Sequence, residues 1–502
     1  MEMDTAAACA EGLSRAQAQL AELIPLEAQR TLLNRALTMQ PSLAGLRQLA
    51  ALEVRASHVC AAAELLRQIP RYLWTEAGPS TDWHDQMRLS LTSLGCDLPE
   101  PSPPSNRLVI AFAFPPFATA SGNVMARRIE ADGGKVDVIS NDMSGRERID
   151  RTFYGAIAPL IGQHIVLNSE NWPARSAAFS DFADKAQAAV ASGLFGRTHY
   201  PEVRSRAMWA QSHFAAAAVL AAGRADRWVA EFSDPCRLDL HGQHAAAPAD
   251  DAWLERIGIA DLLRQRGHAV PQGRSLMYWV EYLPFCLADR IIFTNEVQRD
   301  VMLSQAEDTP ELRARASGVA EVIAHPEPGA RILSALPMPK PVRGSIWIGY
   351  FGNCNPRRGL STLLNALSAL PEDLRGAVQL HLHGPEPEGL RALIRQLDIV
   401  PMVRVHPPLD YLEALARMRT MDWLFVNDTS STGAFGVTPF LPSKLADYRS
   451  AARPILALAE PGGPLSQAPL PPGSLCVNMG DEDALRDVMG QIAASGRESL
   501  QS

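Results

Sequence analysis

Apolar residues recur every three or four positions through the first hundred residues, for example over 43–52 and 60–69. This spacing places them on one face of a helix, and the β-branched runs typical of strands are absent from this part of the sequence. Residues 37–68 contain a proline that opens one helix and a small-residue turn before a second, which resembles a tetratricopeptide unit. We therefore expect residues 1–98 to form an all-α domain, either such a helical repeat or a plain helical cap.

The pattern changes after the proline-rich segment PEPSPPS, where short apolar runs begin to alternate with helical stretches. These runs are bounded by turn-forming residues, which is typical of buried parallel strands. They lie at 107–114, 136–140, 164–168, 228–232 and 290–294. A small-residue loop and a predicted helix at 123–132 follow the first run, which indicates a βαβ unit. We expect a linker at 99–106 and a doubly wound α/β lobe over 107–335.

A second α/β series begins with SIWIGYF at 345–351, after the proline-studded connection 337–341. Its further apolar runs lie at 378–383, 403–406, 423–427 and 454–459. We expect a second Rossmann-like lobe over 342–480, followed by a C-terminal helix and tail at 481–502. Because open parallel sheets bind ligands outside the carboxyl ends of their strands, the two lobes predict a binding site between them.

Composition narrows the class of protein. The chain of 502 residues is 47% hydrophobic with a net charge of −8, so a basic face for nucleic acid is not expected. Its seven cysteines are scattered and never in CxxC spacing, which favours a reducing cytoplasm over a disulfide framework or a zinc site. No apolar run reaches the roughly 18 residues that span a bilayer, and residues 1–11 do not resemble a secretory signal.

Two loops are candidates for binding an anion. The loop PPFATASG, ending near Gly122, leads into a helix whose first amides suit a phosphate; close packing of an ordinary α/β turn is the alternative. In the second lobe Arg357 and Arg358 follow the strand that ends at Gly352. They are placed to pair with a diphosphate, unless they are solvated surface arginines.

The segment 422–458 carries the most specific pattern. Here PSK opens a helix with Ser443 and Lys444 in its first turn. A lysine is unfavourable at a helix N-terminus, and Lys444 is one of only four lysines, so a bound phosphate explains it better than helix stability does. Asp447 lies one turn along on the same face, where it can accept hydrogen bonds from ribose hydroxyls or simply pair with Lys444.

Together these motifs resemble the family-4-type glycosyltransferases of the GT-B fold. The resemblance rests on the PP-loop-G turn, the pair Asp234 and Pro235, the G-x(5)-RG motif at 352–359 and PSKLxDY followed by RPIL, and it covers roughly residues 107–495. It implies a hexosyltransferase-type enzyme that holds the nucleotide of a UDP- or GDP-linked sugar on the second lobe. It also implies an acceptor bound on the first lobe, retention of anomeric configuration, and no metal or other cofactor.

The resemblance also implies roles for residues at matching positions. Arg358 would pair with the donor diphosphate, Asn353 stands where arginine is common, and Asp447 would bind the ribose. A glutamate that contacts the sugar in the family falls on Pro439, so Lys444 and the 432–436 loop would take over its contacts. The remaining donor-binding candidates are Gly122, Gly352, Gly384, Val405, His406, Gly433, Ala434, Phe435, Gly436 and Ser443.

On the acceptor side Asp234 and His241 are the candidates for direct chemistry, and each has a structural alternative such as capping a turn. The expected acceptor is a glycan, a lipid-linked sugar or a protein. The helical N-terminus offers a surface for a protein partner. We expect a cytoplasmic protein, attached peripherally to the inner membrane if the acceptor is lipid-linked.

Two other functions remain open at this point. A nucleotide-sugar 2-epimerase has the same two-lobed architecture, although its acid pairs are not evident in the sequence. The missing glutamate at Pro439 favours a second alternative, a catalytically degenerate protein that binds partners.

Overall fold

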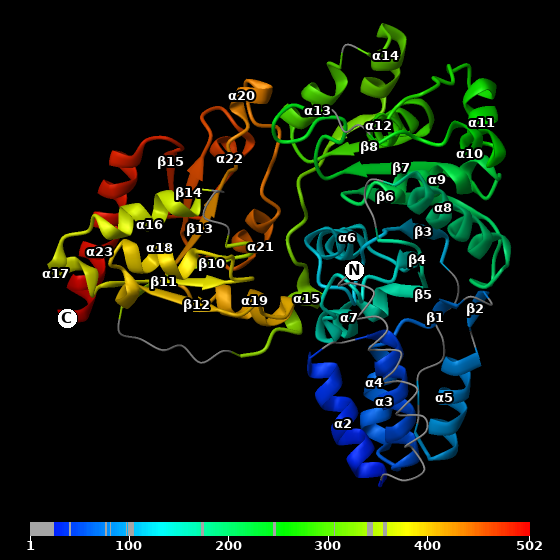
Figure 1. The fold of residues 1–502 in the computed structure, drawn as a ribbon, viewed down its shortest axis with the longest axis horizontal. Coiled ribbons are helices and arrows are strands. Elements are labelled where there is room, and N and C mark those ends of the chain that lie inside the picture. Colours follow the sequence, from blue (N-terminus) through cyan, green and yellow to red (C-terminus); the bar gives the residue numbers. More distant parts are fainter. Residues whose placement is uncertain are drawn as a thin grey trace.

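The computed structural model describes residues 25–501 apart from 40–41, 76–77, 81, 97, 99–104, 172–174, 244–246, 306, 339–344 and 355–358. Arg357 and Arg358, and most of the predicted proline linker, therefore lie outside the described residues. Figure 1 shows a helical region in blue, a first α/β lobe in cyan to green above it, and a second lobe in yellow to red beside the first.

The first lobe is built on a parallel sheet of the doubly wound type. Its strands are β3 (Arg107–Ile110), β4 (Val136–Asn141), β5 (Ile161–Leu167), β6 (Tyr200–Ala207), β7 (Ala225–Phe232), β8 (Arg290–Phe293) and β9 (Ala320–Val322). Their order, β5-β4-β3-β6-β7-β8-β9, reverses direction between β3 and β6, which is the switch point where such sheets bind ligands. The predicted α/β lobe is confirmed.

Helices cover both faces of this sheet. They are α6 (Ala120–Asp132), α7 (Arg151–Ile157), η1 (Ala158–Leu160), α8 (Ser176–Ala191), α9 (Gln211–Ala221), α10 (Asp251–Arg256), α11 (Ile259–Gln265), α12 (Leu276–Leu287), α13 (Glu296–Leu303), α14 (Pro310–Gly318) and α15 (Ala330–Ser334). Helix α6 begins three residues before the predicted start because Thr119 caps it, accepting a hydrogen bond from the Gly122 N–H at 3.1 Å.

The N-terminal region is helical, as predicted, and it also contains two strands that the sequence did not predict. The helices are α2 (Leu26–Met39), α3 (Leu43–Arg55), α4 (Val59–Arg67) and α5 (Asp82–Ser93). Between α4 and α5, β1 (Tyr72–Thr75) pairs antiparallel with β2 (Gly78–Ser80) and parallel with β5 of the first lobe. The expectation of an all-α domain is corrected in this respect, because β1 is held in the sheet by pairing with β5, which is distant in the sequence and leaves no local pattern.

The second lobe repeats the doubly wound plan. Its strands are β10 (Ile346–Phe351), β11 (Val378–His383), β12 (Val403–His406), β13 (Trp423–Asn427), β14 (Ile455–Ala459) and β15 (Leu475–Asn478). They lie in the order β12-β11-β10-β13-β14-β15, all parallel, with the switch point between β10 and β13.

Helices of the second lobe are α16 (Leu360–Ser368), α17 (Glu372–Arg375), α18 (Leu390–Gln396), η3 (Val400–Met402), α19 (Tyr411–Met418), α20 (Thr432–Phe435), α21 (Lys444–Ser450), α22 (Pro464–Gln467) and α23 (Glu482–Gln501). The C-terminal helix α23 packs against α16 and α17, so it belongs to this lobe.

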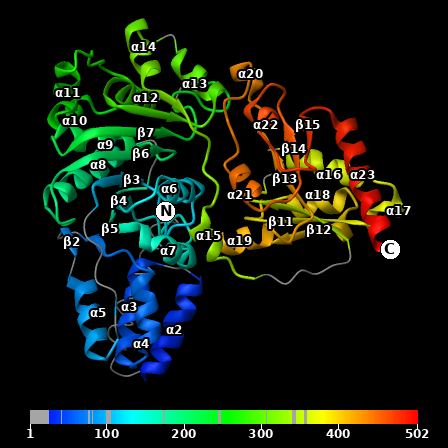
Figure 2. The same cartoon turned by 180° about the vertical axis from the view of Figure 1, so that it is seen from behind.

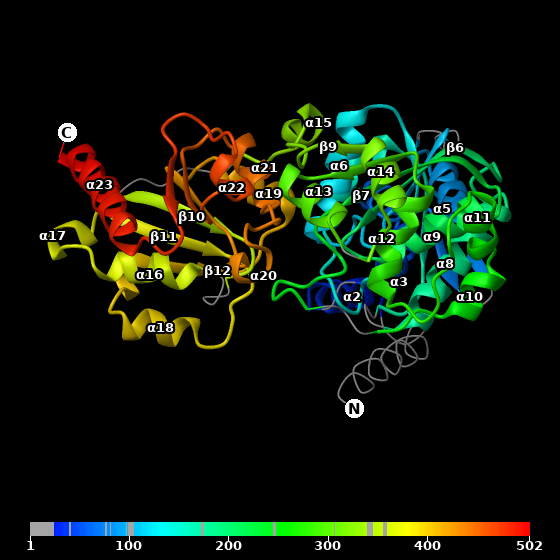
Figure 3. The ribbon, with the colours of Figure 1, turned by 90° about the horizontal axis from the view of Figure 1, so that it is seen from above.

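The two lobes meet through loops that follow the carboxyl ends of strands. Figures 2 and 3 show α15, α19 and α21 between the lobes from two directions. A buried apolar cluster is common to both lobes, joining residues such as Val109 and Phe153 of the first to Tyr411 and Leu445 of the second. Among the described residues no helix combines the length and the apolar character needed to cross a membrane.

Candidate functional site

Lys444 lies at the switch point of the second lobe. It opens α21, and its Nζ lies 3.8 Å from the ring centroid of Tyr350 on β10. The next element of the site is Gly352, directly after β10, whose φ of +130° suits only glycine. A Cβ at Gly352 would lie 3.5 Å from the Lys444 Nζ. The structure therefore brings these two sequence-predicted residues together at the carboxyl end of β10.

Gly384 explains how the loops after β10 and β11 come close together. A Cβ built on Gly384 would lie 1.8 Å from the carbonyl oxygen of Gly352, so no larger residue fits there. The Gly352 N–H donates to the carbonyl of His383 at 2.9 Å, and the Gly384 N–H donates to that of His406 at 3.3 Å. The three strand ends β10, β11 and β12 are thus tied together into one edge.

Asp447 joins the two lobes. Its Oδ1 accepts hydrogen bonds from the guanidinium of Arg127 on α6 and from the Tyr411 hydroxyl, the latter at 2.5 Å. Burial raises the pKa of the Asp447 carboxyl, while the adjacent Arg127 charge opposes that rise. The predicted ribose contact of Asp447 stays a prediction, and a ribose would compete with Arg127 and Tyr411 for this oxygen.

The remaining donor-side candidates are spread over both lobes. Ser443 is the N-cap residue of α21. The Tyr350 hydroxyl donates a hydrogen bond to the backbone carbonyl of Asn353, at 2.9 Å. Val405 and His406 are the last residues of β12, while Gly433, Ala434, Phe435 and Gly436 lie in or just after α20. Gly122 is buried in the first turn of α6, and its N–H is committed to Thr119. Their roles in donor binding stay predictions.

Pro439, which stands where the family has a glutamate, takes part in a contact between the lobes. Its carbonyl accepts a hydrogen bond from the side-chain amide of Asn295, at the start of α13, at 3.0 Å. This position therefore contributes a backbone contact between the lobes.

Asp234 and His241 lie on the first-lobe side of the interface. Asp234 follows β7, and burial raises the pKa of its carboxyl to about 6, although the charge of Arg206 acts in the opposite direction. His241 is exposed in a loop that touches the second lobe, because a Cβ at Gly242 would lie 3.1 Å from the Cβ of Ala434. The predicted acceptor loop and the predicted donor loop around α20 are thus neighbours.

Sequence reasoning missed a buried cluster of charges behind Asp234. Glu231 on β7 accepts hydrogen bonds from Arg206 on β6 and from Arg128 on α6, the latter at 3.2 Å. His325 is buried beside these arginines, and burial together with their charge lowers its pKa well below the usual value. The arginines within the strand sequence YPEVRSRA were the available signal, because a buried strand retains such residues only when they are paired.

Sequence reasoning also missed two acidic residues, Asp428 and Glu460, which follow the carboxyl ends of β13 and β14. Asp428 accepts a hydrogen bond from the Glu460 N–H at 2.9 Å, and Glu460 accepts one from the Ser431 N–H at 2.9 Å. Burial raises the pKa of Asp428 to about 7, and the neighbouring Glu460 charge adds to the rise. These carboxylates hold the loop that leads into α20.

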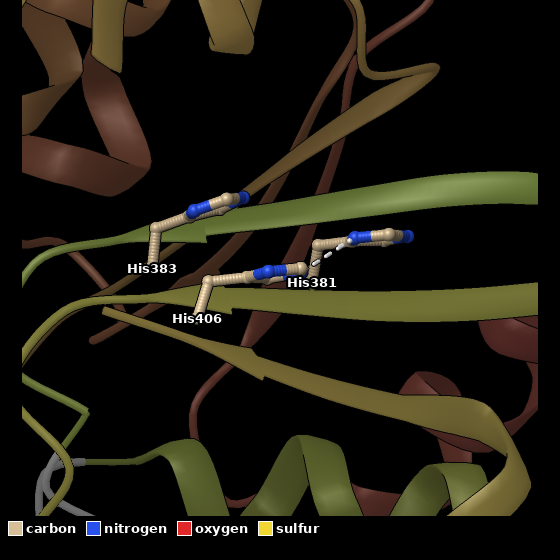
Figure 4. A group of neighbouring side chains, drawn as sticks. All are labelled: His381, His383 and His406. Carbon is tan, nitrogen blue, oxygen red and sulfur yellow. Dashed lines mark hydrogen bonds between the residues drawn. The ribbon is translucent and has the colours of Figure 1, made fainter. Parts of the chain in front are cut away.

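Three histidines gather at the outer edge of the second sheet. His381 and His383 come from β11 and His406 from β12, and Figure 4 shows their rings extending in the same direction. A nitrogen from each lies within 4.8 Å of the others, which satisfies the spacing of a metal site. However, the three rings lie within 14° of parallel, so their lone pairs do not converge on one point as metal ligands must.

Two doubly wound lobes with facing strand ends constitute the GT-B architecture predicted from the sequence. No model of a known protein family and no curated protein matches the chain.

Several solved structures match over most of their length. The lipopolysaccharide outer core galactosyltransferase WaaB, in its apo form, is 14% identical with a TM-score of 0.44, and the match covers 78% of this chain and 90% of that one. The sucrose-phosphate synthase from Thermosynechococcus elongatus is 15% identical with a TM-score of 0.45, over 79% and 94%. A putative UDP-N-acetylglucosamine 2-epimerase from Listeria monocytogenes is 10% identical with a TM-score of 0.46, over 79% and 90%.

Proposed function

We propose that the protein is a glycosyltransferase that moves a sugar from a nucleotide-sugar donor to a glycan, lipid-linked or protein acceptor. The observation that carries the proposal is the placement of Lys444. A lysine at the first position of α21, with its ammonium beside Gly352 at the switch point, supplies positive charge where doubly wound sheets bind phosphates.

The donor side of the proposed reaction needs fixed positive charge. Breaking the bond between sugar and phosphate develops negative charge on the leaving diphosphate, and groups aimed at that charge lower the barrier. We propose that Lys444, Arg358 and the amides of residues 433–436 supply this stabilisation. Asp447 would hold the ribose by accepting hydrogen bonds from its hydroxyls in place of the one from Arg127.

The acceptor side needs a group that can receive a proton near neutral pH. With a pKa of about 6, the Asp234 carboxyl is largely ionised at pH 7 and basic enough to accept a proton from an attacking hydroxyl. Asp234 follows β7 and begins the segment that carries His241.

We propose that the reaction needs no divalent metal and no other cofactor. The proposal rests on the resemblance and on the cationic side chains, which would neutralise the diphosphate directly. Full activity after chelation with EDTA and exhaustive dialysis would support it. Loss of activity on chelation with recovery on adding magnesium or manganese would contradict it.

The decisive experiment incubates the full chain with UDP- and GDP-linked sugars and analyses the products by NMR spectroscopy, which distinguishes sugars that differ only in configuration. A glycosyltransferase releases the nucleoside diphosphate, by slow hydrolysis even without an acceptor. A 2-epimerase would instead yield an isomerised sugar together with free UDP or a UDP-sugar of altered configuration at carbon 2. A chain that binds nucleotide without changing any donor would support the degenerate alternative.

A further inference from the structure

Residues 234–243 follow β7 and carry both acceptor-side candidates, Asp234 and His241, so we call them the acceptor segment. The structure describes every residue of this segment, and none of them lies in a helix or a strand. Its position therefore depends largely on side-chain contacts with neighbouring elements.

Glu281 of α12 holds the backbone near the start of the acceptor segment. Its Oε1 accepts hydrogen bonds from the Cys236 N–H at 2.7 Å and from the Arg237 N–H at 3.0 Å. Glu281 is 1% exposed, so both bonds lie away from water, where solvent cannot replace a lost acceptor. This carboxylate therefore fixes the chain a few residues after Asp234.

A buried ion-pair network surrounds this carboxylate. The Arg237 guanidinium lies 3.1 Å from the Glu281 Oε2 and donates hydrogen bonds to both oxygens of Asp308, each at 3.0 Å. It also lies over the Tyr278 ring of α12, 4.5 Å from the centroid. The three charged side chains are between 1% and 3% exposed, and we call Glu281, Arg237 and Asp308 the clamp. Because a buried charge that loses its partner is strongly destabilising, the clamp favours one arrangement of the segment.

The other end of the acceptor segment is a tight turn against the second lobe. The Asp239 carboxylate accepts hydrogen bonds from the His241 and Gln243 N–H groups at 2.8 and 2.9 Å. A Cβ built on Gly242 would lie 3.1 Å from the Cβ of Ala434, so the turn adjoins α20. The segment is thus held at its start by the clamp and at its end by this turn.

We propose that Glu281 is a positioning residue for the transfer reaction, which holds the Asp234 carboxyl where it can accept a proton from the attacking hydroxyl. This inference rests on the proposed function, in which Asp234 is the proton acceptor. Glu281 itself takes no proton from the substrate, because it is buried and its two oxygens face the amides and Arg237. Its effect comes from geometry, since a displacement of a reacting group by about 1 Å can reduce the rate on the order of a hundredfold.

The test measures the release of nucleoside diphosphate, by variants of the full chain, from whichever UDP- or GDP-linked sugar the wild type turns over. Glu281→Leu removes the acceptor of both amides and should lower kcat about tenfold or more. The KM for the donor should stay the same, because Lys444 lies in the other lobe. Glu281→Gln keeps an acceptor oxygen and should remain within about threefold of the wild type. Glu281→Asp keeps the charge on a shorter side chain and should lower kcat between about threefold and tenfold, even if Glu281→Leu does not fold.

Glu53→Leu is the matched control. Glu53 is also buried, at 4% exposed, and accepts a hydrogen bond from Arg30 at 2.9 Å, but it lies on α3 in the helical region. Its loss should lower the melting temperature, as the loss of Glu281 does, and leave kcat unchanged.

Carboxyl carbon NMR gives a readout that does not depend on turnover, with Asp234→Asn assigning the signal. In the intact protein burial raises the pKa of Asp234 from 3.8 to about 6, with the charge of Arg206 opposing the rise. Freed from its place, the carboxyl should return toward a pKa of 3.8 in Glu281→Leu, whereas Glu281→Gln and Glu53→Leu should keep the wild-type value. The pH at which kcat rises should shift downward with this pKa.

An Asp234 pKa that is the same in the wild type and in Glu281→Leu would overturn the inference. Equal losses of kcat in Glu281→Leu and Glu53→Leu would overturn it as well, because they would show an effect of stability alone. If the wild type turns over no donor, the proposed function fails, and the pKa of Asp234 in Glu281→Leu alone decides whether the clamp fixes this carboxyl.

Discussion

Lys444 stands at a helix N-terminus, where the helix dipole disfavours a cation. The structure offers it the ring of Tyr350, a contact worth about 0.5–2 kcal/mol, which compensates in part for this placement. The ammonium lies at the strand end beside Gly352, where it would adjoin the diphosphate of the proposed donor.

We expect Lys444→Ala to weaken the binding of UDP and GDP about tenfold or more, because a hydrogen bond to a charged group contributes about 1.5–3 kcal/mol. Isothermal titration calorimetry measures the change. Lys185→Ala is the matched control, since Lys185 pairs with Asp181 on α8 in the other lobe and should leave affinity unaltered. Equal affinities in wild type and Lys444→Ala would contradict the assignment.

The buried carboxyl of Asp428 should make the stability of the protein depend on pH. Because burial raises its pKa from 3.8 to about 7, the native state holds this proton more tightly than the unfolded state does. Its contribution to stability is therefore full below pH 4 and is lost as the pH rises to about 7. Asp428→Asn should raise the free energy of unfolding at pH 8, by up to about 1.4 kcal/mol for each pKa unit of the shift, and change it little at pH 4.

Urea denaturation at pH 4, 6 and 8 would measure this effect. The exposed residue Asp483 provides a control, and Asp483→Asn should follow the wild-type profile at all three values. A stability gain for Asp428→Asn that is the same at pH 4 and pH 8 would show that packing, not ionisation, is responsible.

At the scale of elements, β1 connects the helical region to the first lobe. It pairs with β5, and Arg71 just before it bonds the Gln163 side chain at 3.2 Å. Leucines of α3 and α4 belong to the same buried cluster as the strands of the first lobe. These contacts tie the helical region to the core of the first lobe.

We expect a chain that starts at Ser105 to unfold at a lower temperature than the full chain and to aggregate more readily, because deletion leaves the β5 edge and its apolar neighbours exposed. A matched variant, Leu73→Pro in the full chain, removes one β1 amide from the sheet and should lower the melting temperature in the same direction. Leu73 pairs with Val166 of β5, so its amide lies within the ladder. A truncated chain as stable and soluble as the whole would show that the first lobe is complete without β1.

The sequence predicted most strands of the two sheets but missed β1, β2, β6, β9 and β15. The runs at 378–383, 403–406 and 423–427 coincide with β11, β12 and β13. Strand β6 was missed because Arg204 and Arg206 interrupt its apolar pattern, and these arginines are buried against Asp132 and Glu231 from other elements. Pairing across 25 or more positions leaves no local signal.

Contacts between residues that are distant in the sequence also account for the part of the site that could not be predicted. Lys444 and Gly352 follow from local helix and turn chemistry, which the sequence displays, whereas Gly384 was implied only by the family resemblance. The bond between Arg127 and Asp447 joins positions 320 residues apart, and the stacking of His383 on Phe351 depends on the register of two strands. Only the folded sheet brings these groups together.

At the scale of the whole molecule, the two lobes are joined by side-chain contacts as well as by the chain that connects them. The Phe153 and Tyr411 rings meet at 4.5 Å across the lobes, and the Tyr411 N–H donates to the Asp150 carboxylate at 2.6 Å. Because the apolar cluster is shared, opening the lobes fully would expose buried residues of both. We therefore expect the lobes to unfold in a single cooperative transition.

Differential scanning calorimetry would show this as agreement between calorimetric and van't Hoff enthalpies. Tyr411→Ala removes a buried ring from the shared cluster, and such a truncation costs about 3–5 kcal/mol. Tyr411→Phe keeps the ring and loses only the hydroxyl bond to the Asp447 carboxylate, so it should cost about 1.5–3 kcal/mol. Two separate transitions in the wild-type protein would show that the lobes are energetically independent.

The pairing of β1 with β5 also affects how the chain folds during translation. Translation releases β1 and β2 long before β5, because residues 76–160 separate β1 from its parallel partner. At about 5–20 residues per second, this interval lasts on the order of ten seconds. During that time the hairpin can form, but one edge of β1 has no partner and the leucine-rich helices beside it lack the sheet that will cover them. The nascent chain is therefore vulnerable to association with other nascent chains early in synthesis, and we expect its yield of folded protein to depend on the rate of elongation through this segment.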